Sequence, residues 1–352
     1  MGQIVFPAAS QVVEQLDALS SDAADEVTRR IYENHPGLYQ RFGEKGKSTC
    51  REDLLHHLDY LSSALYAGDS APFREYVLWL SGVLESRGVP SAHLKESLQL
   101  LNDFFRSNLT AERFTLLAEV LQNGADALAS NLPASPRFLR LLPEPMGESR
   151  DYLQALLSGS RPAALDAALK SMQHEVSLTD VGVLVIQPAM YEIGSLWETN
   201  RITVAQEHMA TAITQNVMAQ TFAAADFAQP LDRKAIFACV PGNHHSLGLR
   251  MISDAFEVSG WTVQFLGADV PISDLITQIS HWQPELVGLS LSLPGHIKLT
   301  RTIIEQLRAE LGANCPAILV GGLATNQADK LWKAVNADLW AANARDAVKE
   351  MK

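Results

Sequence analysis

The last third of the chain alternates short apolar runs with longer segments of helical periodicity. The apolar runs cover residues 235–240, 262–267, 286–292, 317–322 and 337–342. Short β-rich runs separated by helical patterns of about ten or more residues are typical of βαβ units and a parallel sheet. Five such strands predict an α/β, flavodoxin-like (Rossmann-like) domain over residues 233–352.

Residues before this region show almost no strand pattern. Between Asp151 and Asp226, leucine and alanine recur three and four positions apart, which predicts a helical domain over residues 150–228. Helical periodicity also runs through residues 54–61, 73–84, 93–105 and 114–128, with Pro and Gly between these segments. We therefore predict a multi-domain chain whose first 138 residues form an all-α domain of globin-like size, followed by a Pro-rich joint at 141–148.

A histidine loop follows the first predicted strand. Residues 241–248 read Pro-Gly-Asn-His-His-Ser-Leu-Gly, and the carboxyl end of a strand is where open α/β sheets place their ligands. An imidazole in this position is a candidate metal ligand. The spacing Asn243-x-His245-x-x-Gly248 resembles the Asp-x-His-x-x-Gly loop of cobalamin-binding domains. That resemblance implies that His245 is the lower axial ligand of cobalt.

Two more strand ends resemble the same family. Ser290 and Ser292 end the third predicted strand, Gly321 and Gly322 end the fourth, and residues 265–271 also look like this family. In the family, the nucleotide tail of the cofactor passes between such positions. A hydroxyl there can satisfy a ring nitrogen, and glycine permits close approach of the backbone.

One position departs from the family pattern. Asn243 stands where relatives have an acid that holds the second nitrogen of the ligand histidine. An amide oxygen can accept that hydrogen bond and fix the tautomer, but it adds less basicity to the imidazole than a carboxylate does. We therefore expect a weaker and more labile bond between His245 and cobalt.

The predicted helical domain at residues 150–228 contains a second motif, at residues 194–208. Thr203 is a candidate helix cap, and Val204, Glu207 and His208 then fall on one helical face. Together with Trp197, this pattern resembles the four-helix cap of light-sensing, adenosylcobalamin-dependent repressors. The resemblance implies that these four side chains enclose the adenosyl group on the upper face. Otherwise, Trp197 is a core residue and the two polar residues are solvated.

The residue after the tryptophan also differs from those repressors. They carry a histidine that becomes the upper cobalt ligand after photolysis, whereas this chain has Glu198. A carboxylate is a poor substitute for imidazole on Co(III). We expect His208 or water to take the upper position after illumination.

The N-terminal domain resembles the globin-like biliverdin domain of photocobilins. Residues 53–61, 76–79 and 87–90 carry this resemblance, together with the order of the domains. It implies a biliverdin site in which Asp53 and His57, four apart on a helix, serve the pyrrole nitrogens, with Arg51 or Arg74 for the propionates. Tyr60, Tyr76, Trp79 and His93 are nearby in sequence. Two alternatives remain, a haem ligated by His57 or His93 and a helical docking or dimerisation domain.

Composition narrows the functional classes. The chain has 352 residues with 40 acidic and 28 basic side chains, a net charge of −12. This balance argues against nucleic acid as a main partner, because phosphate contacts need clustered Lys and Arg. Three scattered cysteines, with no metal-binding spacing, and no apolar run of about 18 residues predict a cytoplasmic protein without a membrane partner.

These resemblances together imply a light sensor rather than an enzyme. In this interpretation, the chain binds adenosylcobalamin and a linear tetrapyrrole, and light breaks the Co–C bond. A change in a homo-oligomer or in binding to an unidentified output protein then follows. The rival interpretations are a corrinoid carrier protein of a methyltransfer system, a cobalamin storage module, and a helical docking domain fused to a cobalamin-binding module.

Overall fold

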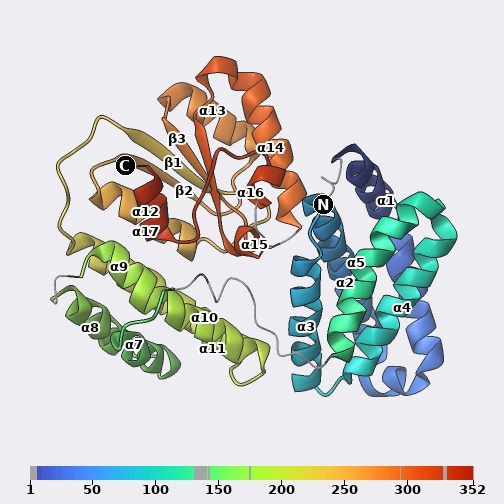
Figure 1. Cartoon of the computed structure of the whole chain (residues 1–352). Helices are drawn as coiled ribbons and strands as arrows, with labels where there is room; N and C mark the ends of the chain where they lie inside the picture. The colour runs from blue at the N-terminus through green and yellow to red at the C-terminus, as the bar shows by residue number, and fades with distance from the viewer. Residues whose placement is uncertain are drawn as a thin grey trace. The chain divides into compact units, whose positions relative to one another are not determined.

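The computed structural model describes residues 6–130, 141, 143–173, 176–293, 295–327 and 331–351. The chain divides into two compact units, Met1–Pro136 and Arg137–Lys352, which are described separately (Figure 1). The domain end expected at residue 138 lies outside the described residues, as does part of the Pro-rich joint. Among the described helices, none is both long enough and apolar enough to cross a membrane.

The first unit is helical throughout its described residues. It consists of α1 (Phe6–Asn34), α2 (Pro36–Ala67), α3 (Ala71–Ser86), α4 (Ser91–Asn108) and α5 (Ala111–Ala129). The four segments predicted from periodicity lie within α2 to α5. The whole of α1 and the first half of α2 were not predicted. The all-α class is confirmed.

Prolines and glycines set the ends of these helices. Pro36 occupies the first turn of α2, where its missing N–H costs nothing, and Gly68 ends that helix in the left-handed conformation with φ 64°. Gly124 has a different purpose, because a Cβ there would lie 2.9 Å from the ring of Phe73. This glycine therefore lets α5 approach α3 closely.

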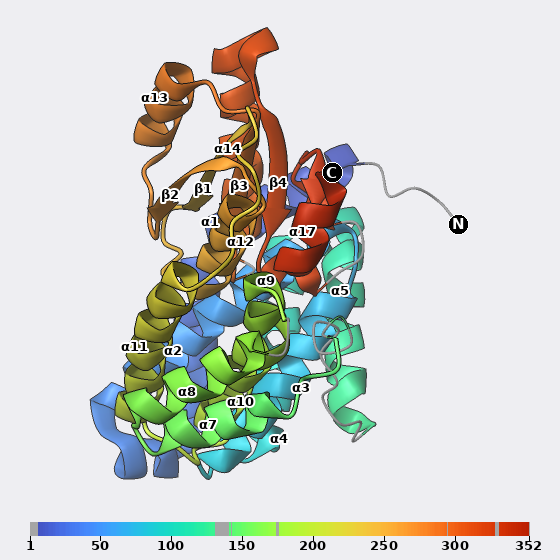
Figure 2. The same ribbon diagram turned by 90° about the vertical axis from the view of Figure 1, so that its left-hand side faces the viewer.

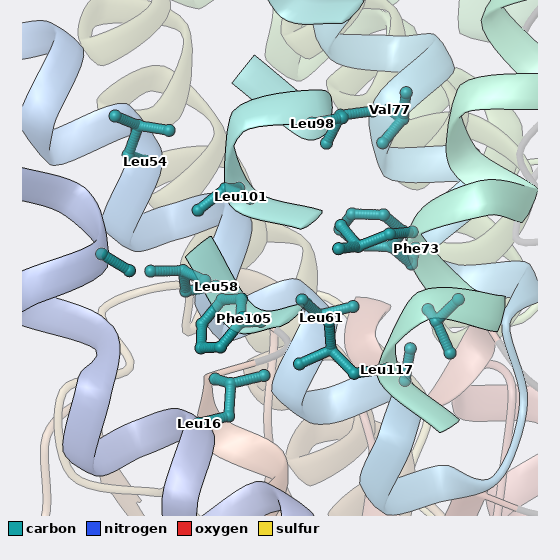
Figure 3. Packing of buried hydrophobic residues seen from close by; sticks show 14 of the residues in the cluster. Leu16, Leu54, Leu58, Leu61, Phe73, Val77, Leu98, Leu101, Phe105 and Leu117 are labelled. Carbon is teal, nitrogen blue, oxygen red and sulfur yellow. The ribbon is translucent and has the colours of Figure 1, made fainter. Parts of the chain in front are cut away.

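A single apolar core fills this unit. Figure 3 shows side chains from all five helices meeting there, and Leu16, Leu61, Phe73, Leu101 and Phe105 are all fully buried. Burial of such side chains contributes roughly 1.5–3 kcal/mol each relative to leaving them exposed. The core depends on leucines spaced three and four apart, the pattern that predicted the helices.

The second unit begins with a helical bundle. Its elements are α7 (Glu148–Leu157), α8 (Arg161–Met172), α9 (Leu178–Val181), the π-helical turn Gly182–Ile186, α10 (Gln187–Glu198) and α11 (Val204–Ala223). The π-helical turn joins α9 and α10 into one longer helix, so four helical rods pack together. Tyr152 is fully buried among them and donates its hydroxyl to Thr214 Oγ1 at 3.0 Å.

A five-stranded parallel sheet follows the bundle. The strands are β1 (Lys234–Cys239), β2 (Thr262–Gly267), β3 (Leu286–Ser290), β4 (Ala317–Gly321) and β5 (Leu339–Trp340), in the order β2-β1-β3-β4-β5. This is the flavodoxin-like order that the apolar runs predicted. β5 has only two residues, whereas the sequence predicted six.

Helices cover both faces of this sheet. α12 (Leu247–Val258) and α17 (Ala344–Glu350) pack on one face, and α13 (Ile272–Trp282) and α14 (His296–Leu311) lie on the other (Figure 2). Between β4 and β5 the described residues form the short helices α15 (Leu323–Asn326) and α16 (Leu331–Ala334), and a 3₁₀ turn, Gly312–Asn314, precedes β4. The strand order reverses between β1 and β3, because β2 is added on one side of β1 and β3 on the other. This creates the switch point at which such sheets bind ligands.

The bundle and the sheet domain are joined by direct contacts. Val183 packs with Ala255 and Ala344, and Arg345 Nε donates to Asp180 at 2.8 Å. Asp254, also at this junction, is paired with Arg250, yet burial raises its pKa to about 6. One end of the bundle, around α9 and the π-helical turn, is therefore attached to α12 and α17.

Candidate functional site

The histidine loop lies at the carboxyl edge of the sheet, directly after β1. His245 is exposed there, and its neighbour His244 is exposed as well. Because all five strands are parallel, the loops after β1, β3 and β4 meet at this one edge. The imidazole of His245 is therefore exposed to solvent beside the ends of β1 and β3.

Asn243 holds the histidine loop in place from beneath. It is fully buried, its Nδ2 donates to the carbonyl oxygen of Ser290 at 2.8 Å, and its Oδ1 accepts from the backbone N–H of His245 at 3.1 Å. The amide thus connects the loop after β1 with the end of β3. Its oxygen is bonded to the backbone of His245 in this structure, whereas the sequence led us to expect a bond to the imidazole.

Two residues that were not among the predicted site residues also shape this loop. Asp269, at φ 51° after β2, accepts from the backbone N–H of Gly242 at 2.8 Å. His296 begins α14, and a Cβ on Gly242 would lie only 3.8 Å from its Nε2. Burial lowers the pKa of His296, the nearby His245 lowers it further, and a hydrogen bond to Gly242 opposes both. The sequence indicated these two residues only indirectly, because each follows a strand that is adjacent to β1 in the sheet.

The predicted glycines fall into two kinds. Gly322 has φ 103°, and a Cβ there would lie 2.3 Å from the carbonyl oxygen of Leu291, so only glycine fits. Gly248, on the first turn of α12, has open space where its side chain would be. Gly322 is therefore required by the fold itself, whereas Gly248 leaves room that the protein does not use.

Ser290 and Ser292 both lie at the end of β3 and are largely buried. Burial raises the pKa of the adjacent thiol, Cys239, to about 11, although a hydrogen bond with Ser290 opposes the shift. Gly321 continues this edge, where the carbonyl oxygen of Ala341 lies 3.4 Å from the place of a Cβ. The site residues predicted on β3 and β4 thus lie together at one edge, with the histidine loop beside them.

The cap motif occupies the corner between α10 and α11. Thr203 caps α11, because its hydroxyl accepts from Gln206 N while Gln206 Oε1 accepts from Thr203 N. Trp197 and Val204 are 36% and 52% exposed. Trp197 is therefore not a core residue.

The polar members of the motif contact one another. Glu207 Oε1 accepts from Thr211 at 3.0 Å, and His208 Nε2 lies 3.5 Å from Glu207 Oε2. The His208 side chain is 75% exposed. Trp197 lies about 20 Å along the helix from Leu184 at the attached end of the bundle. The motif thus forms an exposed corner at the opposite end of α10.

A separate cluster surrounds His57 in the first unit. The ring is buried, shares a 2.7 Å hydrogen bond between Nδ1 and the Tyr76 hydroxyl, and has its pKa lowered to about 3 by burial. Tyr60 stacks on Tyr76 with ring centroids 3.7 Å apart, and the ring centroids of Trp79 and Tyr76 are 5.9 Å apart. The structure thus brings together four of the aromatic residues that were close in sequence.

Other residues assigned to the bilin site in the sequence analysis lie differently. Burial raises the pKa of Asp53, one turn before His57, with a smaller opposing effect from His56. Arg51 donates hydrogen bonds to the side chains of Asp25 and Ser21. His93 packs against His35, with ring centroids 4.5 Å apart, and not in the His57 cluster.

Three protein families match successive parts of the chain. Residues 233–351 match the B12 binding domain family, residues 149–221 match a second B12 binding domain family, and residues 5–128 match the phycobilisome protein family. The chain joins a phycobilisome-type domain to a two-part B12-binding region. The fold and the family resemblances expected from the sequence are thereby confirmed.

Relatives of two kinds share the B12-binding region. Dimethylamine corrinoid protein 3 of Methanosarcina acetivorans is 26% identical over 212 residues, which are 58% of this chain and 96% of that protein. The HTH-type transcriptional repressor CarH of Myxococcus xanthus is 29% identical over 140 residues, 40% of this chain and 46% of the repressor. The chain thus spans less than half of the repressor but nearly all of the corrinoid protein.

A solved structure supports the same architecture. The monomethylamine corrinoid protein of Methanosarcina barkeri aligns with a TM-score of 0.51 at 18% identity, covering 57% of this chain and 94% of that one. At this identity, the likeness concerns the fold alone.

The residues present fit a cobalamin. An exposed imidazole, His245, can ligate cobalt, the open space at Gly248 admits a close approach, and the buried hydroxyls of Ser290 and Ser292 lie near the glycines that end β4. This B12-binding protein therefore has a suitable donor at the carboxyl edge of its sheet.

Proposed function

We propose that this protein is a light sensor that binds adenosylcobalamin in its B12-binding region and a bilin in its phycobilisome-type domain. The observation that carries the proposal is the exposure of Trp197, near the end of α10, and of Val204, at the start of α11, in a B12-binding cap on the same chain as a phycobilisome-type domain. Large apolar side chains exposed together at one corner are characteristic of a binding surface. The adenosine of the cofactor is the partner we assign to that corner.

The chain's own residues have distinct tasks in this proposal. His245 donates an imidazole nitrogen from the loop that Asn243 and Asp269 hold in place. Trp197 and Val204 exclude water from the opposite face, and Glu207 orients His208. Adenosylcobalamin, when bound, supplies a cobalt–carbon bond that visible light breaks.

Loss of the adenosyl group would remove the partner of the exposed cap corner. The bundle is attached to the sheet domain through Asp180 and Arg345 and through the apolar contacts of Val183, near the end away from Trp197. Movement about this attachment would expose or bury the cap corner. We propose that a change in oligomeric state or in binding to an output protein follows.

The phycobilisome-type domain supplies the second pigment site. Tyr60, Tyr76 and Trp79 form an aromatic wall beside the buried His57, whose ring offers a polar contact inside an apolar environment. A linear tetrapyrrole needs apolar and aromatic surface with a few polar groups for its nitrogens. We therefore propose biliverdin as the ligand, with Asp53 on the same helix as a second polar group.

Absorbance spectra of the full chain test both assignments. Protein incubated in the dark with adenosylcobalamin and biliverdin is separated from free pigment, and spectra are recorded against each pigment alone. We expect one equivalent of cobalamin in a His-ligated form and a red band shifted from that of free biliverdin. Absence of the red band would mean that the first unit is a docking domain. Absence of bound cobalamin would overturn the proposal that the protein is a light sensor.

A corrinoid carrier is the second candidate, because this chain covers 96% of a dimethylamine corrinoid protein. A methyl carrier must leave the upper face open to a partner's active site, and it has no use for selectivity toward a bulky adenosyl group. Affinities for adenosylcobalamin and methylcobalamin separate the two functions. Preference for the adenosyl form supports sensing, whereas equal affinity supports the carrier.

A further inference from the structure

Two histidines and a glutamate converge in the phycobilisome-type domain, away from the His57 cluster. His35 lies between α1 and α2, while His93 and Glu96 lie on the first two turns of α4. One donor atom from each of the three lies within 4.8 Å of the others, and all three side chains are partly buried. Segments about sixty residues apart are thus brought to one point.

The residue types and their spacing resemble a metal ligand set. His93 and Glu96 are three residues apart on one helix, a spacing that places a histidine and a carboxylate on the same face in metal-binding helix bundles. His35 adds the third donor from another element. Its Nε2 shares a 2.5 Å hydrogen bond with Glu96 Oε2, and the two atoms would have to separate to bind one ion.

Neighbouring groups prepare these donors. Asn34 Nδ2 donates to the other carboxylate oxygen of Glu96 at 2.8 Å and fixes its orientation, as outer-sphere partners of metal ligands do.

The hydrogen bond between His35 and Glu96 leaves one feature unexplained. The Nδ1 atom of His93 is buried and has no hydrogen-bond partner among the described residues, which costs free energy in a folded protein. Its ring stands edge-on to that of His35, at 88°. A shared cation would use one donor from each ring.

We propose that His35, His93 and Glu96 form a binding site for a divalent transition-metal ion of the zinc class. Two imidazoles and one carboxylate suit Zn²⁺ better than Mg²⁺ or Ca²⁺, which prefer oxygen ligands. Three protein donors leave a fourth position for water or a small anion. The ion would tie the corner between α1 and α2 to the start of α4, and it would be independent of both pigments.

Zinc binding by the full chain tests this site. The protein is first loaded with cobalamin, so that His245 is occupied, then treated with a chelator and titrated with zinc chloride by calorimetry, with elemental analysis of the dialysed sample. We expect His93→Asn to remove one zinc equivalent and Glu96→Gln to weaken zinc affinity at least about tenfold, since even changes to outer-sphere partners cost about 10–100-fold. Zinc should also raise the melting temperature of wild type more than that of Glu96→Gln.

The matched control is His56→Asn, which removes an exposed histidine from α2 in the same unit. It should bind zinc like the wild type. If His93→Asn does not fold, Glu96→Gln carries the test, because an amide keeps the size of the side chain. Wild-type zinc stoichiometry and affinity in folded His93→Asn or Glu96→Gln would overturn the proposal, as would failure of the wild type to bind this equivalent.

Discussion

Asn243 donates a hydrogen bond from Nδ2 to the carbonyl oxygen of Ser290, 2.8 Å away, from a fully buried position beneath the histidine loop. A carboxylate cannot make this bond, because it has no proton to donate. An acid at this position would instead place a second negative oxygen beside the carbonyl. The asparagine of this chain therefore stabilises the junction of β1 and β3 directly.

Asn243→Asp should destabilise the cobalamin-free protein by about 1–3 kcal/mol, the range for losing a buried hydrogen bond and leaving its partner unsatisfied. Urea unfolding followed by circular dichroism measures the change. Asn314→Asp, at an exposed position in the same domain, is the control and should have little effect. Equal stability of Asn243→Asp and wild type would mean that the bond to Ser290 contributes nothing.

The two kinds of glycine at the site predict opposite outcomes. Gly322→Ala should lower the free energy of unfolding by about 2–4 kcal/mol, because φ 103° and the carbonyl of Leu291 leave no place for a Cβ. Gly248→Ala should leave stability nearly unchanged but weaken cobalamin binding by about tenfold, or about 1.4 kcal/mol. Unfolding curves and cobalamin titrations of both variants check this contrast. Undiminished cobalamin affinity in Gly248→Ala would show that the cofactor does not use that space.

Trp197→Ala should reduce the preference for adenosylcobalamin over methylcobalamin while leaving methylcobalamin affinity intact. Aromatic stacking on a base contributes about 1–3 kcal/mol, so we expect the preference to fall about tenfold or more. Titration of both cobalamins into wild type, Trp197→Ala and Phe227→Ala makes the comparison. Phe227 is the control because it is 50% exposed but lies outside the cap corner. Parallel loss of both affinities would contradict the assignment of Trp197 to the adenosyl group.

His57 should make the first unit sensitive to acid. Its pKa is about 3 in the folded chain and about 6.5 when unfolded. Between these values the unfolded state binds more protons. Stability therefore rises with pH across this window, with a slope of up to about 1.4 kcal/mol per pH unit, and is lost as pH falls below about 6.5. His57→Gln should remove that part of the slope, which urea unfolding of both proteins at several pH values would reveal. An identical pH dependence in the variant would mean that His57 is not buried as a neutral ring.

Much of the fold follows from local pattern. The strands were predictable because Ile236, Val287 and Ile318 lie in short apolar runs that are buried on both faces of the sheet. Thr203 was predictable as a cap because a hydroxyl three residues before Gln206 satisfies the first turn of a helix. α1 was not predicted, since its long run mixes alanine, serine and charged residues, and its helical form depends on tertiary packing of residues such as Leu16.

Candidate site residues could be named where chemistry is concentrated in a short motif. His245 and Gly248 are three residues apart, at the end of the loop after β1 and the start of α12, so their spacing was visible in the sequence. Asp269 lies in the family-like segment 265–271 but was given no role, and His296 was missed because it reaches the histidine loop only through the order of the strands. His35 and Glu96 come together only when α4 packs on α1, which no local pattern specifies.

The most direct test of the sensor is the size of the full-length protein loaded with adenosylcobalamin, measured by size-exclusion chromatography with light scattering, in the dark and after green light. Loss of absorbance alone is insufficient, because the free cofactor is also light-sensitive. We predict a light-dependent change in oligomeric mass or hydrodynamic radius that is absent from protein loaded with methylcobalamin. His245→Ala should lose the His-ligated spectrum and the light response together. Identical dark and illuminated profiles for wild type, with cobalamin bound throughout and no change on adding biliverdin, would contradict light sensing through quaternary structure.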